Sequence, residues 1–309
     1  MELPCRYALM TKNVGSEEER SFIMNITLEK YHGLGNDYLI FDPNKNELEL
    51  TEESVRLICN RNFGVGSDGL LVGPILGQDK LELKILNPDG SEAELSGNGV
   101  RIFGKYLKDA GYVQKNRFIV NTLSGQQTIQ YLNEDGTKIK VSMGKLSFYS
   151  DEIPVTGPRR EVLNETMMFG SIPYRVTCVT IGNPHCVIWL NDISKELACR
   201  IGKHSETADY FPEKINTELL RVVDRTNVEI EIYERGAGYT LASGTSGCAA
   251  AGAAYRMGLT DPKMYVHMPG GVLEVEIEKD GGVLMTGEVG YVGRFILSHE
   301  MTEQLRALQ

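Results

Sequence analysis

The sequence lacks the features that define several classes of protein. Among its 309 residues, no apolar run approaches the ~18 residues that a membrane-spanning helix needs. It also lacks an excess of basic residues: 32 Lys and Arg against 42 Asp and Glu give a formal net charge of −10. Such a balance argues against a nucleic-acid partner, which needs a basic surface. The negative net charge does not exclude an anionic small-molecule substrate, because a binding site can be locally positive.

Motifs for the common cofactors are missing as well. None of the six cysteines stands in a C-x-x-C pair, so we expect no metal site of the zinc type. The sequence contains no pyridoxal-phosphate lysine motif and no dinucleotide fingerprint. The stretch Gly64-Val-Gly-Ser-Asp-Gly69 resembles a nucleotide loop, but it follows a predicted helix instead of a strand. We therefore predict a protein without cofactor or metal.

Residues 1–23 lack the apolar segment of a secretory signal and contain Glu17-Glu-Glu-Arg20, so we interpret them as an N-terminal extension. Six cysteines in a long chain without such a signal are typical of reduced thiols, which predicts a cytoplasmic protein. The length suggests two domains.

The most informative feature is a near-repeat. The segment Asn87-Pro-Asp-Gly-Ser-Glu-Ala-Glu-Leu-Ser96-Gly-Asn-Gly99 is answered by Glu234-Arg-Gly-Ala-Gly-Tyr-Thr-Leu-Ala-Ser243-Gly-Thr-Ser246. Each ends in Ser-Gly, and each leads into a predicted helix, over Val100–Ala110 and Cys248–Met257. Because the first amides of a helix have no partner within it, two such N-termini can face one anion from two sides. This arrangement suits chemistry on both faces of a small carboxylate.

The predicted elements repeat in the same way. Several strands precede each of these helices and more strands follow it, which indicates an internal duplication with a boundary near Met143. Each polar motif also has an ordinary interpretation. Serine is a preferred N-cap, Asn183-Pro-His185 is a common turn, and Glu234-Arg235 is typical of a solvated pair. Their occurrence together favours a site.

Together, these motifs resemble those of the diaminopimelate epimerase family, in a superfamily that also holds proline racemases and phenazine-biosynthesis isomerases. The resemblance runs from residue 24 to about residue 297. It is carried by the following segments: His32-Gly-Leu-Gly-Asn-Asp37, Gly64-Val-Gly-Ser-Asp-Gly-Leu70, Asn87-Pro-Asp-Gly-Ser-Glu92, Ser96-Gly-Asn-Gly99, Gly182-Asn-Pro-His-Cys186, Glu234-Arg-Gly-Ala-Gly238, Gly244-Thr245 and Met268-Pro-Gly-Gly271.

The resemblance implies an α/β fold of two pseudo-symmetric domains, each a mainly antiparallel sheet wrapped around a central helix, with the site between them. We expect the first domain over residues 24–142 and 293–309 and the second over 143–292. The resemblance also implies a homodimer and a small amino-acid substrate. The family inverts an α-carbon with two cysteines, one on each face, while the helix N-termini hold the α-carboxylate.

Carried over residue by residue, the resemblance places Ser96 and Ser243 at the two acid/base positions, with His185 beside Ser96 and Glu234 beside Ser243. The backbone of Gly97, Asn98, Gly244 and Thr245 would bind the reacting carboxylate. The far end of the substrate would be bound by Asn36, Asn87, Asn183, Asn216 and Arg235. The planar fork of arginine suits a carboxylate there.

The chain departs from the family at both thiols, because Ser96 and Ser243 stand where the family has cysteine. A hydroxyl loses its proton far less readily than a thiol, so proton transfer should be much slower. Tyr239 also replaces a glutamate that the family usually has, which favours a natural branch over a Cys→Ser variant made to trap a substrate. The main hypothesis is conversion of LL- to meso-diaminopimelate by two-base proton transfer, in lysine and peptidoglycan precursor synthesis. The alternatives are a racemase of another amino acid and an inactive amino-acid-binding homologue.

Overall fold

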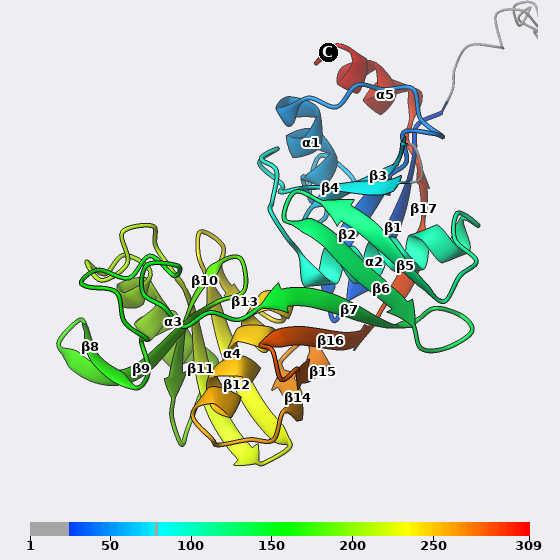
Figure 1. Cartoon of the computed structure of the whole chain (residues 1–309). Coiled ribbons are helices and arrows are strands. Elements are labelled where there is room, and N and C mark those ends of the chain that lie inside the picture. Colours follow the sequence, from blue (N-terminus) through cyan, green and yellow to red (C-terminus); the bar gives the residue numbers. More distant parts are fainter. Residues whose placement is uncertain (1–24, 78–79) are drawn as a thin grey trace, which may run out of the picture.

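Two lobes, each built around one buried helix, make up the molecule (Figure 1). The computed structural model describes residues 25–77 and 80–309, so the proposed extension at residues 1–23 lies outside the described residues. This arrangement confirms the α/β fold with two similar halves, each a mainly antiparallel sheet around a central helix.

The first lobe contains eight of the described strands. They are β1 (Thr27–Gly33), β2 (Asn36–Phe41), β3 (Leu70–Gly77), β4 (Lys80–Leu86), β5 (Arg117–Thr122), β6 (Gly125–Tyr131), β7 (Lys138–Lys145) and β17 (Gly290–Ile296). Its central helix is α2 (Gly97–Asp109), with α1 (Glu52–Cys59) and α5 (His299–Arg306) on the outside.

The second lobe is built from the remaining strands. They are β8 (Glu165–Phe169), β9 (Ile172–Thr180), β10 (Pro184–Trp189), β11 (Asn216–Asp224), β12 (Asn227–Glu234), β13 (Gly238–Thr240), β14 (Lys263–Met268), β15 (Gly271–Ile277) and β16 (Gly282–Glu288). Its central helix is α4 (Gly244–Arg256), and α3 (Lys195–Ser205) covers the outer side.

Hydrogen bonds join all the described strands into one continuous sheet, because β7 of the first lobe pairs with β16 of the second. β17 returns to the first lobe and pairs with β1. The boundaries that we expected at 142/143 and 292/293 fall inside β7 and β17. Since strands instead of a linker cross between the lobes, the division into two domains remains a proposal.

Both central helices are buried on every side along most of their length, from residue 97 to 107 in α2 and from 244 to 254 in α4. A helix buried all round belongs to the core of its lobe. In α4 the buried residues are nearly all Gly, Ala, Ser or Cys, so the strands around it can approach closely. The core packed on α2 is continuous with the core packed on α4.

The helix predictions were confirmed apart from their ends: α2 and α4 begin directly after Ser96 and Ser243, about a turn earlier than expected. Four elements were not predicted from the sequence, namely β3, β8, β13 and α5. β3 is a nearly continuous apolar run containing a proline, which gives no alternation to recognise. α5 packs on the first lobe, where Leu305 joins a core with Ile26 and Val55.

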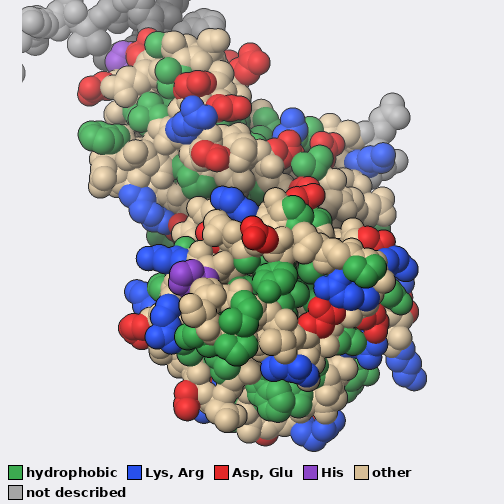
Figure 2. Space-filling model, turned by 90° about the vertical axis from the view of Figure 1, so that its left-hand side faces the viewer, with side chains coloured by type: hydrophobic (Ala, Val, Ile, Leu, Met, Phe, Trp, Pro, Cys, Tyr) green, Lys and Arg blue, Asp and Glu red, His purple; other side chains and the backbone are tan. Residues whose placement is uncertain are grey.

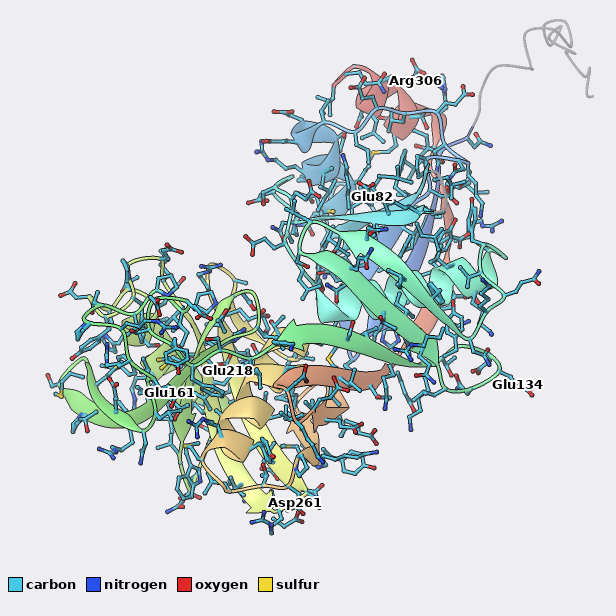
Figure 3. All side chains as sticks on the ribbon, viewed as in Figure 1. Glu82, Glu134, Glu161, Glu218, Asp261 and Arg306 are labelled. Atoms are coloured by element: carbon cyan, nitrogen blue, oxygen red, sulfur yellow. The ribbon has the colours of Figure 1, made fainter. Side chains whose placement is uncertain are left out.

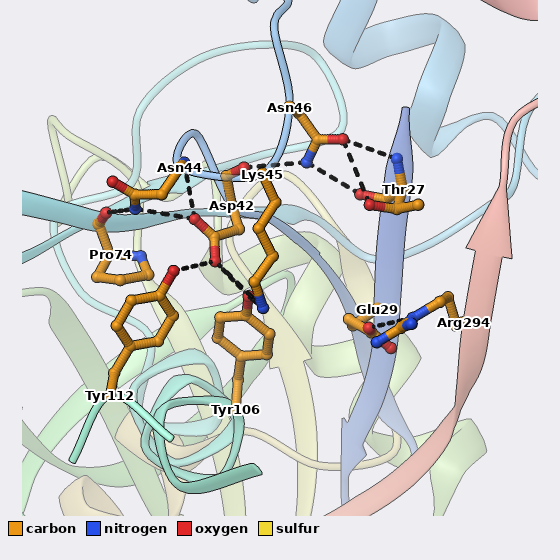
Figure 4. Close-up of polar contacts among 10 residues, drawn as sticks. All are labelled: Thr27, Glu29, Asp42, Asn44, Lys45, Asn46, Pro74, Tyr106, Tyr112 and Arg294. Atoms are coloured by element: carbon orange, nitrogen blue, oxygen red, sulfur yellow. Dashed lines mark hydrogen bonds and ion pairs between the residues drawn. The ribbon is translucent and has the colours of Figure 1, made fainter. Parts of the chain in front are cut away.

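A buried carboxylate ties α2 to the first sheet (Figure 4). Asp42, directly after β2, accepts hydrogen bonds from Tyr106 of α2, from Tyr112 and from Asn44. Burial raises the pKa of Asp42, but these bonds lower it by more, so the net pKa lies below the ordinary value for aspartate. The carboxylate is therefore charged in the folded protein and stabilises it.

The surface carries charges of both signs. Figure 2 shows acidic, basic and apolar side chains interspersed over one face, without a broad basic area. No helix in the described part of the chain is long and apolar enough to cross a membrane.

Candidate active site

Ser96 and Ser243 line one cavity of about 580 Å³, although they lie 147 positions apart in the sequence. Each serine is the N-cap of its central helix. Ser96 Oγ accepts a hydrogen bond from the Gly99 amide at 3.0 Å, and Ser243 Oγ accepts one from the Ser246 amide at 3.4 Å. The two serines therefore have the ordinary capping role and also share a cavity.

The two helix N-termini meet at a pair of glycines. A Cβ on Gly244 would lie 3.3 Å from the Cα of Gly97, which is tighter than most real contacts. A Cβ on Gly97 would lie 2.6 Å from Cε of Met285 and 2.8 Å from Cε of Met143. These methionines come from β16 and β7, the strands that join the lobes. A side chain at position 244 would press on the backbone of the other helix, whereas one at position 97 would displace the ends of the two methionines.

The first residues of both helices, Gly97, Asn98, Gly244 and Thr245, line the cavity as the sequence led us to expect. The amides of a first helical turn have no partner within the helix, and each helix end carries a partial positive charge. Two such ends at one cavity form an environment that favours a small anion such as a carboxylate.

Beside Ser96 stands a tyrosine in place of the expected His185. The Tyr38 hydroxyl donates a hydrogen bond to Ser96 Oγ at 3.1 Å. Tyr38 is buried on β2 and lines the cavity. Burial raises its pKa to about 12, so its hydroxyl remains protonated and can donate. No sequence motif selects this tyrosine, because the segment His32–Asp37 that carries the resemblance ends one residue before it.

Glu234, which the resemblance placed beside Ser243, stands at the end of β12 and in the wall of the cavity. Burial raises the pKa of its carboxyl group, and the hydroxyls of Thr240 and Ser243 lower it by less, so the net pKa lies above the ordinary value for glutamate. A carboxylate with a raised pKa is a stronger base than an exposed one, which suits a proton acceptor.

His185 is fully buried in β10 and does not line the cavity. Its Nδ1 lies 2.7 Å from Oε1 of Glu218 (labelled in Figure 3), and its Nε2 lies 2.9 Å from Oδ1 of Asn183. Asn183 does line the cavity. Since both ring nitrogens are occupied, the expected pairing with Ser96 is not seen, and His185 acts here by holding Asn183.

Two of the remaining amides expected at the substrate, Asn36 and Asn87, also line the cavity. Asn36 donates to Asp68 at 3.0 Å and accepts from Asn98 at 3.1 Å, while Asn87 donates to Ser91. These bonds hold the amide side chains in place around the cavity mouth. They leave further donor and acceptor capacity for a polar ligand.

The structure places Asn216 and Arg235 outside the residues that line the cavity. The Asn216 side chain donates to the carbonyl of Pro184 and accepts from the Arg235 amide, so it braces the backbone. The Arg235 side chain is exposed and donates to the carbonyl of Glu213. In this arrangement neither side chain reaches the position that we expected.

Arg61 is a cavity residue that the sequence did not indicate. It forms ion pairs of 2.6 Å with Asp37 and with Asp68. Burial raises the pKa of Asp37, but hydrogen bonds from Arg61 and Lys30 lower it by more. The spacing of these three residues in the sequence follows no recognisable motif, so only the fold brings them together.

Tyr239 also lines the cavity, at the position where the family usually has glutamate. Its hydroxyl donates to Oε2 of Glu231 at 2.7 Å, and Nζ of Lys195 lies 4.9 Å from its ring centre. Within the described residues, no group of three or more His, Cys, Asp or Glu side chains is arranged to hold a metal ion.

Comparison with known proteins gives clear relatives. Residues 28–149 and 177–292 match the family model described as diaminopimelate epimerase. The chain is 46% identical over 273 residues to diaminopimelate epimerase 2 of Nostoc sp., covering 88% of this chain and 95% of the relative. It is 39% identical over 275 residues to diaminopimelate epimerase of Desulfitobacterium hafniense, covering 87% of this chain and 96% of the relative.

Solved structures of distant proteins share the fold. A probable proline racemase from Agrobacterium radiobacter superposes with a TM-score of 0.65 at 15% identity, over 89% of this chain and 93% of the other. A phenazine biosynthesis protein of Bacillus anthracis gives a TM-score of 0.61 at 17% identity, over 89% of this chain and 99% of the other. The fold is thus the two-lobed one of these proteins.

Proposed function

The chain belongs to the diaminopimelate epimerase family, and we propose that it is a cofactor-independent isomerase that interconverts LL- and meso-diaminopimelate by two-base α-proton transfer. One group would remove the α-proton from one face of the substrate, while a second group would donate a proton to the other face. Such a reaction contributes to the synthesis of lysine and of peptidoglycan precursors.

The observation that carries the proposal is the position of Ser96 and Ser243 at two helix N-termini that line one cavity. The α-carboxylate of an amino acid would accept hydrogen bonds from the amides of both first turns. As the α-proton leaves, negative charge spreads onto this carboxylate, and the positive helix ends stabilise it more strongly in the transition state than in the ground state.

The cavity also supports a substrate with a second polar end. Asn36, Asn87 and Asn183 offer amide groups on its wall, and the ion pair of Arg61 with Asp68 adds charged groups of both signs. We propose that the amides bind the distal amino and carboxylate groups of diaminopimelate. Arg235 and Asn216 would join them only if the lobes rearrange when the substrate binds.

A second candidate is a racemase or isomerase of another amino acid, and Tyr239 is the observation that favours it. A phenol in the wall of the cavity is larger and more apolar than the glutamate usual in the family. The distal end of the substrate would then be less polar than that of diaminopimelate.

We further propose a homodimer in the cytoplasm. Within the described residues, β17 pairs only with β1, and its side chains Tyr291, Val292 and Ile296 are more than half exposed. An edge strand with exposed apolar side chains favours association with a second copy. The five described cysteines are free, which fits a reducing compartment.

The test is α-hydrogen exchange in deuterated water with purified protein and a panel of amino acids. Exchange with inversion of diaminopimelate supports the first candidate. Exchange with another amino acid supports the second, and binding without any exchange supports an inactive homologue and overturns the proposal.

A further inference from the structure

The Ser96 hydroxyl accepts two hydrogen bonds but donates none among the described residues. A hydroxyl group can accept two hydrogen bonds and donate one. Ser96 Oγ accepts from the Gly99 amide at 3.0 Å and from the Tyr38 hydroxyl at 3.1 Å, so both of its lone pairs are occupied. Among the described residues, the Ser96 hydroxyl donates its own proton to no acceptor. Because Ser96 lines the cavity, that proton is available to a bound ligand.

Tyr38 is held firmly in this position. The residue lies on β2, opposite Tyr31 of β1, and it is 8% exposed. Its ring occupies space that a side chain at position 69 would take, because a Cβ on Gly69 would lie 2.5 Å from Cε1 of Tyr38. Burial raises the pKa of Tyr38, so the phenol keeps its proton and its hydroxyl can donate to Ser96.

The environment of Ser243 is different. Glu234, a carboxylate, faces Ser243, and the Ser243 oxygen lies 3.4 Å from the Thr245 hydroxyl and 3.4 Å from the Ser246 amide. A carboxylate accepts protons, whereas a phenol donates a hydrogen bond. The two faces of the cavity therefore differ in chemistry, although the two helices that carry the serines are equivalent in the duplicated fold.

From this asymmetry we propose that Tyr38 is a positioning residue which, with the Gly99 amide, forms a two-donor site for the negatively charged oxygen of Ser96. This inference rests on the proposed function and explains how a serine can replace a thiol as the proton donor. Fixed donors aimed at an oxygen that becomes charged stabilise that charge without reorganisation.

The proton balance is as follows for one direction of the reaction. On the Ser243 face, the α-carbon loses its proton to Ser243 Oγ while the Ser243 hydroxyl proton passes to the Glu234 carboxylate, and the electron pair of the broken C–H bond stays on the α-carbon. On the Ser96 face, the Ser96 O–H bond breaks and its proton forms the new C–H bond with that electron pair. The oxygen is left as an alkoxide that accepts hydrogen bonds from Tyr38 and Gly99. The reverse direction runs through the same steps backwards.

The test is Tyr38→Phe, which removes one donor and keeps the ring. Loss of one such donor lowers the rate of a reaction by about 10²-fold to 10³-fold in comparable sites, and we expect a fall of this size in inversion of diaminopimelate. Because the ratio of kcat/KM in the two directions equals the equilibrium constant of the reaction, which a variant cannot change, Tyr38→Phe must lower kcat/KM equally in both directions. Exchange of deuterium without inversion should survive in the isomer whose α-proton faces Ser243, because that step does not use Ser96.

Tyr131→Phe is the matched control. Tyr131 is equally buried in the same lobe, and its hydroxyl donates to the carbonyl of Gly104 in α2, away from the cavity. We expect Tyr131→Phe to lower the free energy of unfolding about as much as Tyr38→Phe does and to leave the rates of inversion and exchange unchanged. A second pair of variants, Ser96→Cys and Ser96→Cys with Tyr38→Phe, measures the coupling, since a thiol needs the phenol far less.

The outcomes separate the two proposals. If the unmodified protein exchanges no α-hydrogen with any amino acid, the proposed function fails and the role of Tyr38 fails with it. If the unmodified protein is active and Tyr38→Phe leaves inversion unchanged, only the role of Tyr38 is overturned. The role of Tyr38 is also overturned if Tyr38→Phe lowers the rates of inversion and of exchange equally. It is overturned as well if Tyr38→Phe lowers inversion by the same factor in the Ser96→Cys variant as in the unmodified protein. Either result would indicate a merely structural role for Tyr38.

Discussion

The Cα of Gly97 lies 3.3 Å from the point where a Cβ on Gly244 would stand, so the two helix N-termini of the cavity touch through their backbones. This contact sets the distance between the two groups of amides that would share one carboxylate. Because position 244 is glycine, no side chain there presses against the backbone of Gly97.

Substitution Gly244→Ala should therefore lower activity more than stability. The added methyl group can displace the flexible end of Met285, but it also presses against the backbone of Gly97 and moves the helix ends apart. A displacement of 1 Å near a reacting centre can cost 10²-fold in rate, so a few tenths of an ångström should lower kcat/KM by about 10-fold. Steady-state kinetics and a urea titration measure the two effects. Gly77→Ala, at a position with no close neighbour, is the control. Unchanged kcat/KM in the Gly244 variant would show that the contact does not set the site geometry.

Restoring both thiols should increase epimerase activity. In the double variant Ser96→Cys with Ser243→Cys, the helix ends and Glu234 remain, and the groups that transfer protons become more acidic. We expect the rate of inversion of diaminopimelate to rise by about 10²-fold or more, which lies in the range of general acid–base effects. Neither single variant should match the double one, because inversion needs an acid on one face and a base on the other. A double variant that folds, binds diaminopimelate and stays inactive would point to divergence elsewhere in the cavity, with Tyr239 as the first residue to replace.

Glu234 should determine the acid limb of the pH–rate profile. Its pKa is raised by burial, and the carboxylate must be unprotonated to accept a proton. The rate should fall as the pH drops through this raised value, so the fall begins at a higher pH than an ordinary glutamate with a pKa of about 4.3 would give. In Glu234→Gln the limb should vanish, and the remaining rate should be lower by about 10²-fold to 10⁴-fold. Glu229→Gln, which removes a partner of Arg221 elsewhere on the second lobe, should keep the unmodified profile. An identical acid limb in Glu234→Gln would assign it to another group.

Asp42 should contribute pH-dependent stability. Its folded-state pKa lies below the value of about 3.9 in the unfolded chain, so its contribution is present at neutral pH and is lost as the pH falls below about 4 through the folded-state value. Asp42→Asn keeps the shape and removes the charge that Tyr106 and Tyr112 stabilise, which should cost about 2 kcal/mol in the free energy of unfolding at pH 7. Urea titrations at pH 7 and pH 3 should show a difference between the variants that shrinks at the lower pH. Asp192→Asn, at an exposed position, is the control. A difference that stays constant with pH would contradict the assigned charge state.

The positions of several predicted residues followed from local rules. Serine is a preferred N-cap, and Ser96 and Ser243 each cap a helix that begins about a turn before the predicted start. Capping depends on residues within one turn of each other, so the sequence contains all the information needed. The resemblance placed Glu234 beside Ser243, and in the structure the chain runs from the end of β12 through the short strand β13 to the start of α4.

The partner of Ser96 and the position of His185 could not be predicted in this way. Tyr38 lies 58 residues from Ser96 in the chain, and their contact depends on how β2 packs against α2. His185 belongs to a strand whose pairing with β11 brings Asn216 opposite it, and its ring is buried beside Glu218. The ion pairs of Arg61 with Asp37 and Asp68 likewise form only when the chain has folded.

By itself the sequence determined the class of the protein, its duplicated plan, the two serines at the helix N-termini and its family. These depend on composition and on motifs in which the interacting residues are close in the chain. Only the tertiary structure decided that Ser96 faces the phenol of Tyr38 and that His185 is buried away from the cavity. The reason is physical: strand pairing and helix packing select side-chain partners by their distance in space, and residues far apart in the sequence carry no local pattern that reveals it.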